Sequence, residues 1–241
     1  MARAEIKEAI DWAMAPYADA TSATQALRSH ASQAPENGYG TGSVRILSAA
    51  CDRFYKVGFH GTSTRDIATA AGMSATAIYA HYSSKQSMLA KLCILGTASA
   101  LESLQRGADA DLPPTQRLRS AVYSFARWHG ENYIIGRVAQ WDLAALEPSS
   151  FEVVASLRRD IDKELRRTLT EGIEAGEFSI PDLTGTSLAI LSLCIDIVRW
   201  FPSRRIRAPE EIASTYAALV ESMVLPSSAL EQAPRSASRR S

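Results

Sequence analysis

The sequence has few cysteines and no long uninterrupted apolar run. Its three cysteines, Cys51, Cys93 and Cys194, are isolated along the 241 residues and form neither a CxxC pair nor a Cys/His ligand spacing. This pattern argues against a disulfide framework or a zinc site and predicts reduced, buried thiols. Because the chain lacks an apolar stretch of about 18 residues and a basic N-terminal segment followed by an apolar one, neither membrane insertion nor secretion is indicated, and a cytoplasmic location is expected.

The motifs of common catalytic sites are also missing. The sequence contains no Gly-x-Ser-x-Gly elbow, HExxH or Walker loop, and a pairing such as Cys194 with His129 has little support. Three alternating glycines end at Gly42, but no strand pattern precedes them as a nucleotide-binding loop requires. His129 has no second ligand four residues away. We therefore expect no enzyme activity, no metal and no cofactor.

The formal net charge is zero, but the charge is unevenly distributed. Residues 41–91 contain six basic and two acidic side chains, a balance of +4, whereas residues 92–225 contain 14 basic and 18 acidic ones, a balance of −4. A basic module joined to an acidic one is expected when only the first contacts phosphates.

A short stretch beginning at Thr64 predicts two small helices joined by a tight turn. Thr64 is expected to be the N-cap of the first helix, and Asp66 lies in its first turn, where the helix dipole favours negative charge. Gly72 can adopt the left-handed conformation that ends a helix, and Ser74 can cap a second helix running to about Tyr79. Two helices joined by a short glycine-containing turn are typical of a helix-turn-helix unit.

The sequence from Thr64 to Leu89 also resembles the DNA-binding signature of TetR-family transcriptional regulators. The resemblance spans about 26 residues without a gap and rests on Ile67-Ala68, Ala71-Gly72, Ser74, Ile78-Tyr79, His81-Tyr82 and Lys85. It implies a DNA-binding regulator in which the second short helix enters the major groove.

The resemblance implies two kinds of DNA contact. Ser74, Ala75 and Thr76, at the start of the second helix, are expected to face base edges. The residues expected at phosphates are Thr62, Thr64, Tyr79, His81 and Lys85. Ala75 and Thr76 stand where family members often carry a basic residue and a glycine, so direct base readout is expected to be sparse, with DNA shape or the N-terminal arm adding specificity.

Helical periodicity in the rest of the chain predicts an all-α fold. A three-helix DNA-binding domain, residues 43–90 with Ser43 as its first N-cap, is expected to be joined by a long helix, from Ser84 to about Gln105, to a larger helical domain of residues 91–225. Residues 1–42 read as an extension and linker, and residues 226–241 as a disordered tail. The last two helices, about 182–200 and 209–224, are too apolar for one narrow stripe, and the resemblance implies that they form a homodimer interface.

The larger domain is expected to bind an effector between its helices. Candidate lining residues are Phe125, Trp128, His129, Tyr133, Trp141 and Trp200, although ordinary core packing is the alternative for each of them. The order of Trp200, a loop and Pro209-Glu210-Glu211-Ile212 resembles TetR regulators of sterol and fatty-acid breakdown that respond to acyl-CoA thioesters. Arg204 and Arg205 in that loop could bind phosphates, or could belong to a solvated basic loop.

A second basic cluster lies opposite the apolar stripe of Val154 to Ile173. It includes Arg158 and Arg159 and is interspersed with acidic residues, so it is interpreted as a solvated helix face.

These patterns favour a homodimeric repressor that a small hydrophobic effector, such as an acyl-CoA thioester, releases from a palindromic DNA operator. The alternative is a helical module that contacts a protein partner and never reads DNA.

Overall fold

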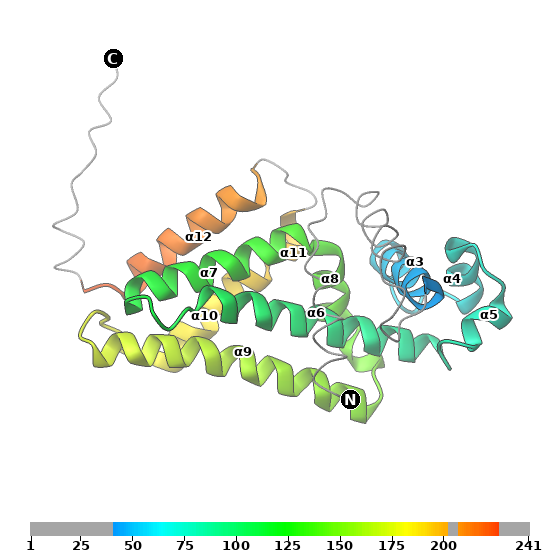
Figure 1. The fold of residues 1–241 in the computed structure, drawn as a ribbon, viewed down its shortest axis with the longest axis horizontal. Coiled ribbons are helices and arrows are strands. Elements are labelled where there is room, and N and C mark those ends of the chain that lie inside the picture. Colours follow the sequence, from blue (N-terminus) through cyan, green and yellow to red (C-terminus); the bar gives the residue numbers. More distant parts are fainter. Residues whose placement is uncertain (1–40, 202–206, 227–241) are drawn as a thin grey trace, which may run out of the picture.

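The computed structural model describes residues 41–201 and 207–226, and every regular element in these two ranges is a helix. Figure 1 shows α3, α4 and α5 at one end of the molecule, the larger helical domain at the other, and α6 running between them. The all-α prediction is therefore confirmed. The elements are α3 (Thr41–Val57), α4 (Thr64–Ala71), α5 (Ala75–Tyr79), α6 (Lys85–Gly107), α7 (Pro114–Glu131), α8 (Tyr133–Trp141), the 3₁₀ turn η1 (Leu143–Ala145), α9 (Pro148–Glu174), α10 (Leu183–Ile195), α11 (Ile197–Trp200) and α12 (Pro209–Val224).

Two helices, α3 and α4, begin earlier in the chain than the sequence predicts. The predicted linker ends at Gly42 and the predicted N-cap is Ser43, but α3 already begins at Thr41 and Ser43 is buried inside it. Likewise, Ser63 and not Thr64 is the N-cap of α4. The Ser63 side chain accepts a hydrogen bond from the Asp66 amide, and Asp66 Oδ2 accepts one from the Ser63 amide at 2.9 Å. This reciprocal pair is a capping box, which Thr64 cannot form from one residue further along.

The other predicted ends of the helix-turn-helix unit are confirmed. Gly72 ends α4 with φ of 64°, in the left-handed region that glycine adopts without a Cβ penalty. The Ser74 side chain accepts a hydrogen bond from the Ala77 amide at 3.1 Å and so caps α5. Ile67 and Ile78 are fully buried and hold α4 and α5 on the core.

The long helix α6 forms the centre of the molecule. Ser84 caps it as predicted, and it continues to Gly107, slightly beyond the expected Gln105. A Cβ at Gly107 would lie only 2.5 Å from the Ser120 carbonyl oxygen, so glycine here allows the backbones of α6 and α7 to approach closely. The helix predicted from residue 182 to 200 is instead divided at Asp196 into α10 and α11.

Helix α8 connects the two ends of the molecule. Tyr55 of α3 meets Tyr133 of α8 edge-on, with ring centroids 5.9 Å apart. The Arg137 guanidinium lies 5.3 Å from the centroid of the Tyr55 ring, and the Phe59 amide donates a 3.4 Å hydrogen bond to Asp142, just after α8. A shift of α8 therefore acts directly on α3 and on the turn that follows it.

Candidate nucleic-acid interface and ligand cavity

The predicted base-reading residues lie together on the exposed side of α5. Ser74, Ala75 and Thr76 are exposed, as are Tyr79 and His81 at the other end of this short helix. The side chain of Tyr79 is 58% exposed, which is high for so large an aromatic residue. In Figure 1, α5 lies at the outer edge of the molecule, away from the larger domain. This arrangement leaves the whole predicted reading surface accessible to a major groove.

Lys85 points toward protein and not toward the predicted DNA surface. Its ammonium donates 2.6 Å hydrogen bonds to the carbonyl oxygens of Phe59 and Thr62 and lies 4.1 Å from the centroid of the Phe59 ring. The side chain is half-buried. Lys85 therefore holds the turn between α3 and α4, a role that the sequence did not indicate.

The two threonines of this turn also differ from a simple phosphate-binding pair. Thr62 is 2% exposed, and its hydroxyl donates a 2.8 Å hydrogen bond to the Gly58 carbonyl. In this structure the Thr62 hydroxyl therefore donates its proton to the protein's own backbone, and its contact with phosphate stays a prediction. Thr64 is half-buried at the start of α4.

A second cation holds the turn between α4 and α5. The Arg45 guanidinium, from α3, donates hydrogen bonds to the carbonyl oxygens of Ala71 at 2.6 Å and Gly72 at 3.4 Å. Cations near the last carbonyls of a helix interact favourably with its dipole. Part of the basic charge counted in residues 41–91 thus bonds to the protein's own carbonyl groups and stabilises the helix-turn-helix unit.

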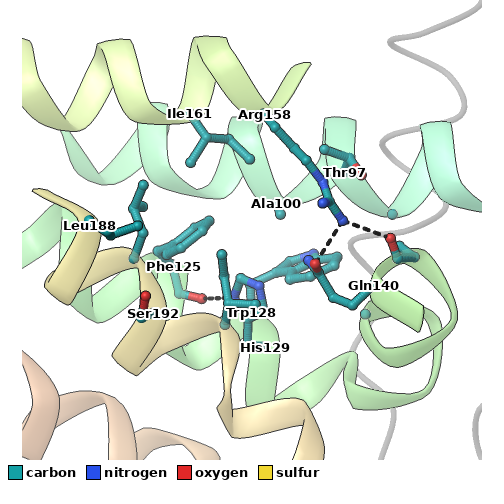
Figure 2. A pocket seen from close by; sticks show the side chains of 15 residues that line it. Thr97, Ala100, Phe125, Trp128, His129, Gln140, Arg158, Ile161, Leu188 and Ser192 are labelled. Carbon is teal, nitrogen blue, oxygen red and sulfur yellow. Dashed lines mark hydrogen bonds between the residues drawn. The ribbon is translucent and has the colours of Figure 1, made fainter. Parts of the chain in front are cut away.

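A cavity of about 170 Å³ lies within the larger domain, between α6, α7, α8, α9 and α10. Figure 2 shows Phe125, Trp128 and His129 at its centre, with Leu188 and Ser192 of α10 on one side. These three central residues, all predicted to line an effector site, are therefore brought together. The Trp128 indole donates a 2.9 Å hydrogen bond to the Ser99 hydroxyl, which fixes its ring.

His129 is a neutral polar group inside this cavity. Its Nδ1 lies 2.8 Å from the Phe125 carbonyl oxygen, so Nδ1 carries the proton and donates, leaving Nε2 as an acceptor. Burial disfavours the charged ring and lowers the pKa of His129 to about 4.

Arg158 also lines the cavity, although the sequence placed it on a solvated face. Its guanidinium donates hydrogen bonds to the Ala139 carbonyl at 3.0 Å and to Gln140 Oε1 at 2.7 Å, as Figure 2 shows. Burial lowers the pKa of Arg158, but a guanidinium stays charged at neutral pH. The sequence spacing already indicated this position, because Arg158 lies four residues after buried Val154 and three before buried Ile161, on the same helix face.

The other predicted effector residues lie elsewhere. Tyr133 is buried between Tyr55 and Phe201, and Trp141 is 56% exposed, with the Arg137 guanidinium 3.8 Å from its ring centroid. Trp200 is half-buried against Phe201. None of these three lines the cavity. Tyr133 and Trp200 pack against Phe201, whereas Trp141 stacks on Arg137 of its own helix at the surface. Arg204 and Arg205 lie outside the described residues.

The cysteines are buried, as expected. Burial raises the pKa of Cys93 and of Cys194 to about 12 and raises the pKa of Cys51 still further. Thiols that stay protonated are poor nucleophiles.

Large apolar side chains are exposed on the last two long helices. Leu188 and Leu193 on α10 are 64% and 38% exposed, and Leu219 and Met223 on α12 are 51% and 46% exposed. The segment Leu183–Trp200 is long and apolar enough to cross a membrane by composition alone, as is α6, but α6 is mostly buried in the protein core. Such exposed apolar side chains make α10 and α12 candidates for an interaction surface.

Comparison with known proteins covers both parts of this architecture. The model described as "Bacterial regulatory proteins, tetR family" matches residues 46–92, and the model described as "Tetracyclin repressor-like, C-terminal domain" matches residues 111–224. A solved structure of a bacterial regulatory protein in the TetR family from Rhodococcus RHA1 is 36% identical, with a TM-score of 0.74 over 77% of this chain and 98% of that chain. No curated protein matches the chain by sequence.

Two more distant solved structures contain ligands. AibR in complex with isovaleryl coenzyme A and operator DNA is 19% identical, with a TM-score of 0.66 over 72% of this chain and 95% of that chain. FadR from Bacillus subtilis in complex with stearoyl-CoA is 18% identical, with a TM-score of 0.61 over 74% of this chain and 97% of that chain. At these identities the similarity establishes the shared fold.

Proposed function

Because the chain belongs to the TetR family of DNA-binding transcriptional regulators, and not to a family of enzymes, we propose that it is a homodimeric repressor released from a palindromic operator by a small hydrophobic effector. The observation that carries this proposal is the presence, in one chain, of an exposed reading helix and a ligand cavity joined by α6 and α8. The DNA partner also implies a cytoplasmic location.

The α5 surface supports operator reading. Ser74, Ala75 and Thr76 are exposed at the start of the helix, where short side chains can contact base edges, and Tyr79 and His81 are exposed beside them for phosphate contacts. Lys85 contributes by holding the preceding turn.

The cavity supports a hydrophobic effector bound against Phe125, Trp128 and His129. An acyl-CoA thioester is the proposed effector class, since AibR and FadR have the same fold and were solved with isovaleryl coenzyme A and stearoyl-CoA. Ligand and operator would then oppose each other through one linked equilibrium.

The exposed apolar side chains of α10 and α12 support the homodimer. Pairing these helices with the same helices of a second copy would bury Leu193, Leu219 and Met223, which otherwise face water. A twofold dimer places its two reading helices on half-sites about one DNA turn apart.

The proposal is tested by selecting bound duplexes from a random DNA pool. We expect a palindromic consensus, and acyl-CoA should lower the affinity for this duplex. A selection that yields no palindrome, or a duplex whose binding no acyl-CoA changes, would contradict the proposal.

The dimer is tested by sedimentation of a Leu219→Glu, Met223→Glu double variant. We expect it to sediment as a monomer because two carboxylates would be buried in the interface. The matched control is Phe151→Glu on α9, which is 47% exposed and lies off both helices; it should remain dimeric.

A further inference from the structure

The ligand cavity contains a cation that no acidic side chain balances. Among its fifteen lining residues, all within the described part of the chain, Arg158 is the only one charged at neutral pH, because burial keeps His129 neutral. The two hydrogen bonds of the Arg158 guanidinium go to uncharged oxygens, and its Nε is buried without a hydrogen-bond partner. A partly buried charge is costly unless a negative or strongly polar group compensates it.

The size and the walls of the cavity limit what can supply that group. Its volume of about 170 Å³ is small compared with the ~300–1,000 Å³ of pockets for drug-sized ligands. At roughly 30 Å³ for each water-sized group, it holds about five or six non-hydrogen atoms. Phe125, Ile161 and Leu191 make most of the remaining wall apolar. The cavity therefore suits a short, compact apolar body with one oxygen-bearing end.

We infer that the cavity binds a short acyl group, about five carbons long, with its carbonyl or carboxylate oxygen held by the Arg158 guanidinium. This inference rests on the proposed function and specifies the effector. Either a coenzyme A thioester or the free carboxylic acid could supply the acyl group, because both end in an oxygen that accepts from a guanidinium. In the thioester, the coenzyme A moiety lies outside the cavity because it is far larger than the space available.

The same guanidinium gives the ligand a route to the DNA-binding domain. Arg158 donates to the Ala139 carbonyl and to the Gln140 side chain, at the C-terminal end of α8. Both bonds come from one guanidinium nitrogen, Nη2, so a ligand oxygen that accepts from Nε or Nη1 draws the guanidinium toward itself and loosens the hold of α9 on that end. Because α8 contacts α3 through Tyr133 and Tyr55, this competition changes how α3 is supported.

Capping of α8 is the plain alternative role for Arg158, since cations favour helix C-termini. Capping alone predicts that removing the charge lowers stability and leaves ligand affinity unchanged. The two roles are therefore separated by measuring binding directly, without DNA.

The test is calorimetric titration of the full chain with isovaleryl-CoA, isovalerate and stearoyl-CoA. We expect the better short probe to bind at least about tenfold more tightly than stearoyl-CoA, and the stronger of the two short probes identifies the source of the acyl group. Arg158→Met should weaken its binding about ten- to hundredfold, the effect of losing one charge-assisted hydrogen bond. The matched control is Arg159→Met, because Arg159 is exposed and pairs with Glu152 on the outer side of the same helix; binding should stay within about twofold.

Two further variants keep the test decisive if Arg158→Met melts early. Arg158→Lys retains the charge and should bind the short probe more tightly than Arg158→Met does. If Arg158→Met is unfolded, Arg158→Lys should still show measurable binding of the short probe. Ala100→Leu adds a larger side chain to the cavity wall from α6 and keeps Arg158 itself unchanged; it should weaken binding by at least about tenfold. The inference is overturned if neither short probe binds the natural sequence, or if stearoyl-CoA binds as tightly as the short probes. It is also overturned if folded Arg158→Met or Ala100→Leu protein binds the short probe with the affinity of the natural sequence.

Operator selection with the ligand-free protein is independent of these results, so failure of this inference is distinguishable from failure of the proposed function.

Discussion

Replacement of Lys85 by methionine should destabilise the DNA-binding domain without changing how many phosphates the protein neutralises. Methionine keeps a flexible stem of similar length but removes the ammonium, and with it two 2.6 Å hydrogen bonds to the carbonyls of Phe59 and Thr62. It also removes the contact with the Phe59 ring at 4.1 Å. The turn between α3 and α4 would lose the one cation that joins its two ends in the described structure.

The magnitude follows from these three contacts. A hydrogen bond to a charged group contributes about 1.5–3 kcal/mol net when well shielded, and a surface cation–π contact about 0.5–1 kcal/mol. Because Lys85 is half-buried and its carbonyl partners can partly regain water, the sum must be discounted. We expect the free energy of unfolding to fall by roughly 2–3 kcal/mol.

The assay combines urea unfolding with operator titrations between about 50 and 200 mM salt. The slope of log affinity against log salt should stay unchanged, while the affinity falls by a similar factor for all duplexes. Lys56→Met is the control for stability, since Lys56 makes only an exposed ion pair with Asp52, worth at most about 1 kcal/mol.

The opposite result has a clear meaning. If Lys85 contacts phosphate, as the sequence resemblance implies, Lys85→Met lowers the salt slope by about one unit and leaves urea unfolding unchanged. That outcome would refute the holding role read from the structure.

Three further predictions concern other parts of the chain. The pKa of His129 is about 4 in the folded protein against an ordinary 6.5, so the unfolded chain binds the proton first as the pH falls. The free energy of unfolding should therefore drop by about 1.4 kcal/mol for each pH unit between these two values. In urea titrations, His129→Gln should remove this slope, whereas His60→Gln on the surface should not. Gly107→Ala should lower the free energy of unfolding by about 1–3 kcal/mol in thermal melts, because its new methyl group meets the α7 backbone. The control is Gly96→Ala, whose methyl group meets mainly side-chain atoms at 3.2 Å and should change the free energy of unfolding by less than about 1 kcal/mol. Thr76→Val should alter the consensus in a random-duplex selection at one position of each half-site, and an unchanged consensus would remove Thr76 from the reading surface.

The fold was predictable because its local signals agree with one another. Ser74, Gly72 and Ser84 each have the residue type that their cap or turn requires, and the sequence identified all three. The error at Thr64 is an error of one position, since Ser63 and Asp66 already have the spacing of a capping box. The start of α3 was missed because glycines lower the helix propensity of this stretch, although the helix already includes Thr41 and Gly42.

The sites were less predictable because a residue type does not specify its neighbours. Trp128 and Trp141 are both tryptophans on amphipathic helices, yet one lines the cavity and the other stacks on Arg137 at the surface. Arg158 was assigned to solvent because it sits among charged residues, although its spacing from Val154 and Ile161 puts it on the apolar face. Lys85 has no sequence signal for its carbonyl partners, which lie 23 and 26 residues earlier.

The two cations that bond to backbone carbonyls also constrain how the larger domain can influence DNA binding. Lys85 fixes the turn before α4 and Arg45 fixes the turn after it, so both connections of that helix are held by hydrogen bonds to carbonyls. A helix-turn-helix unit whose first helix is held at both ends resists local rearrangement and moves more easily as one body. The contacts that can move this unit come from α6, which begins directly after α5, and from α8 through Tyr133 and Tyr55. Because a dimer must match two half-sites at once, a small rotation of such a rigid unit in each copy changes the separation of the reading helices and needs no unfolding of either one.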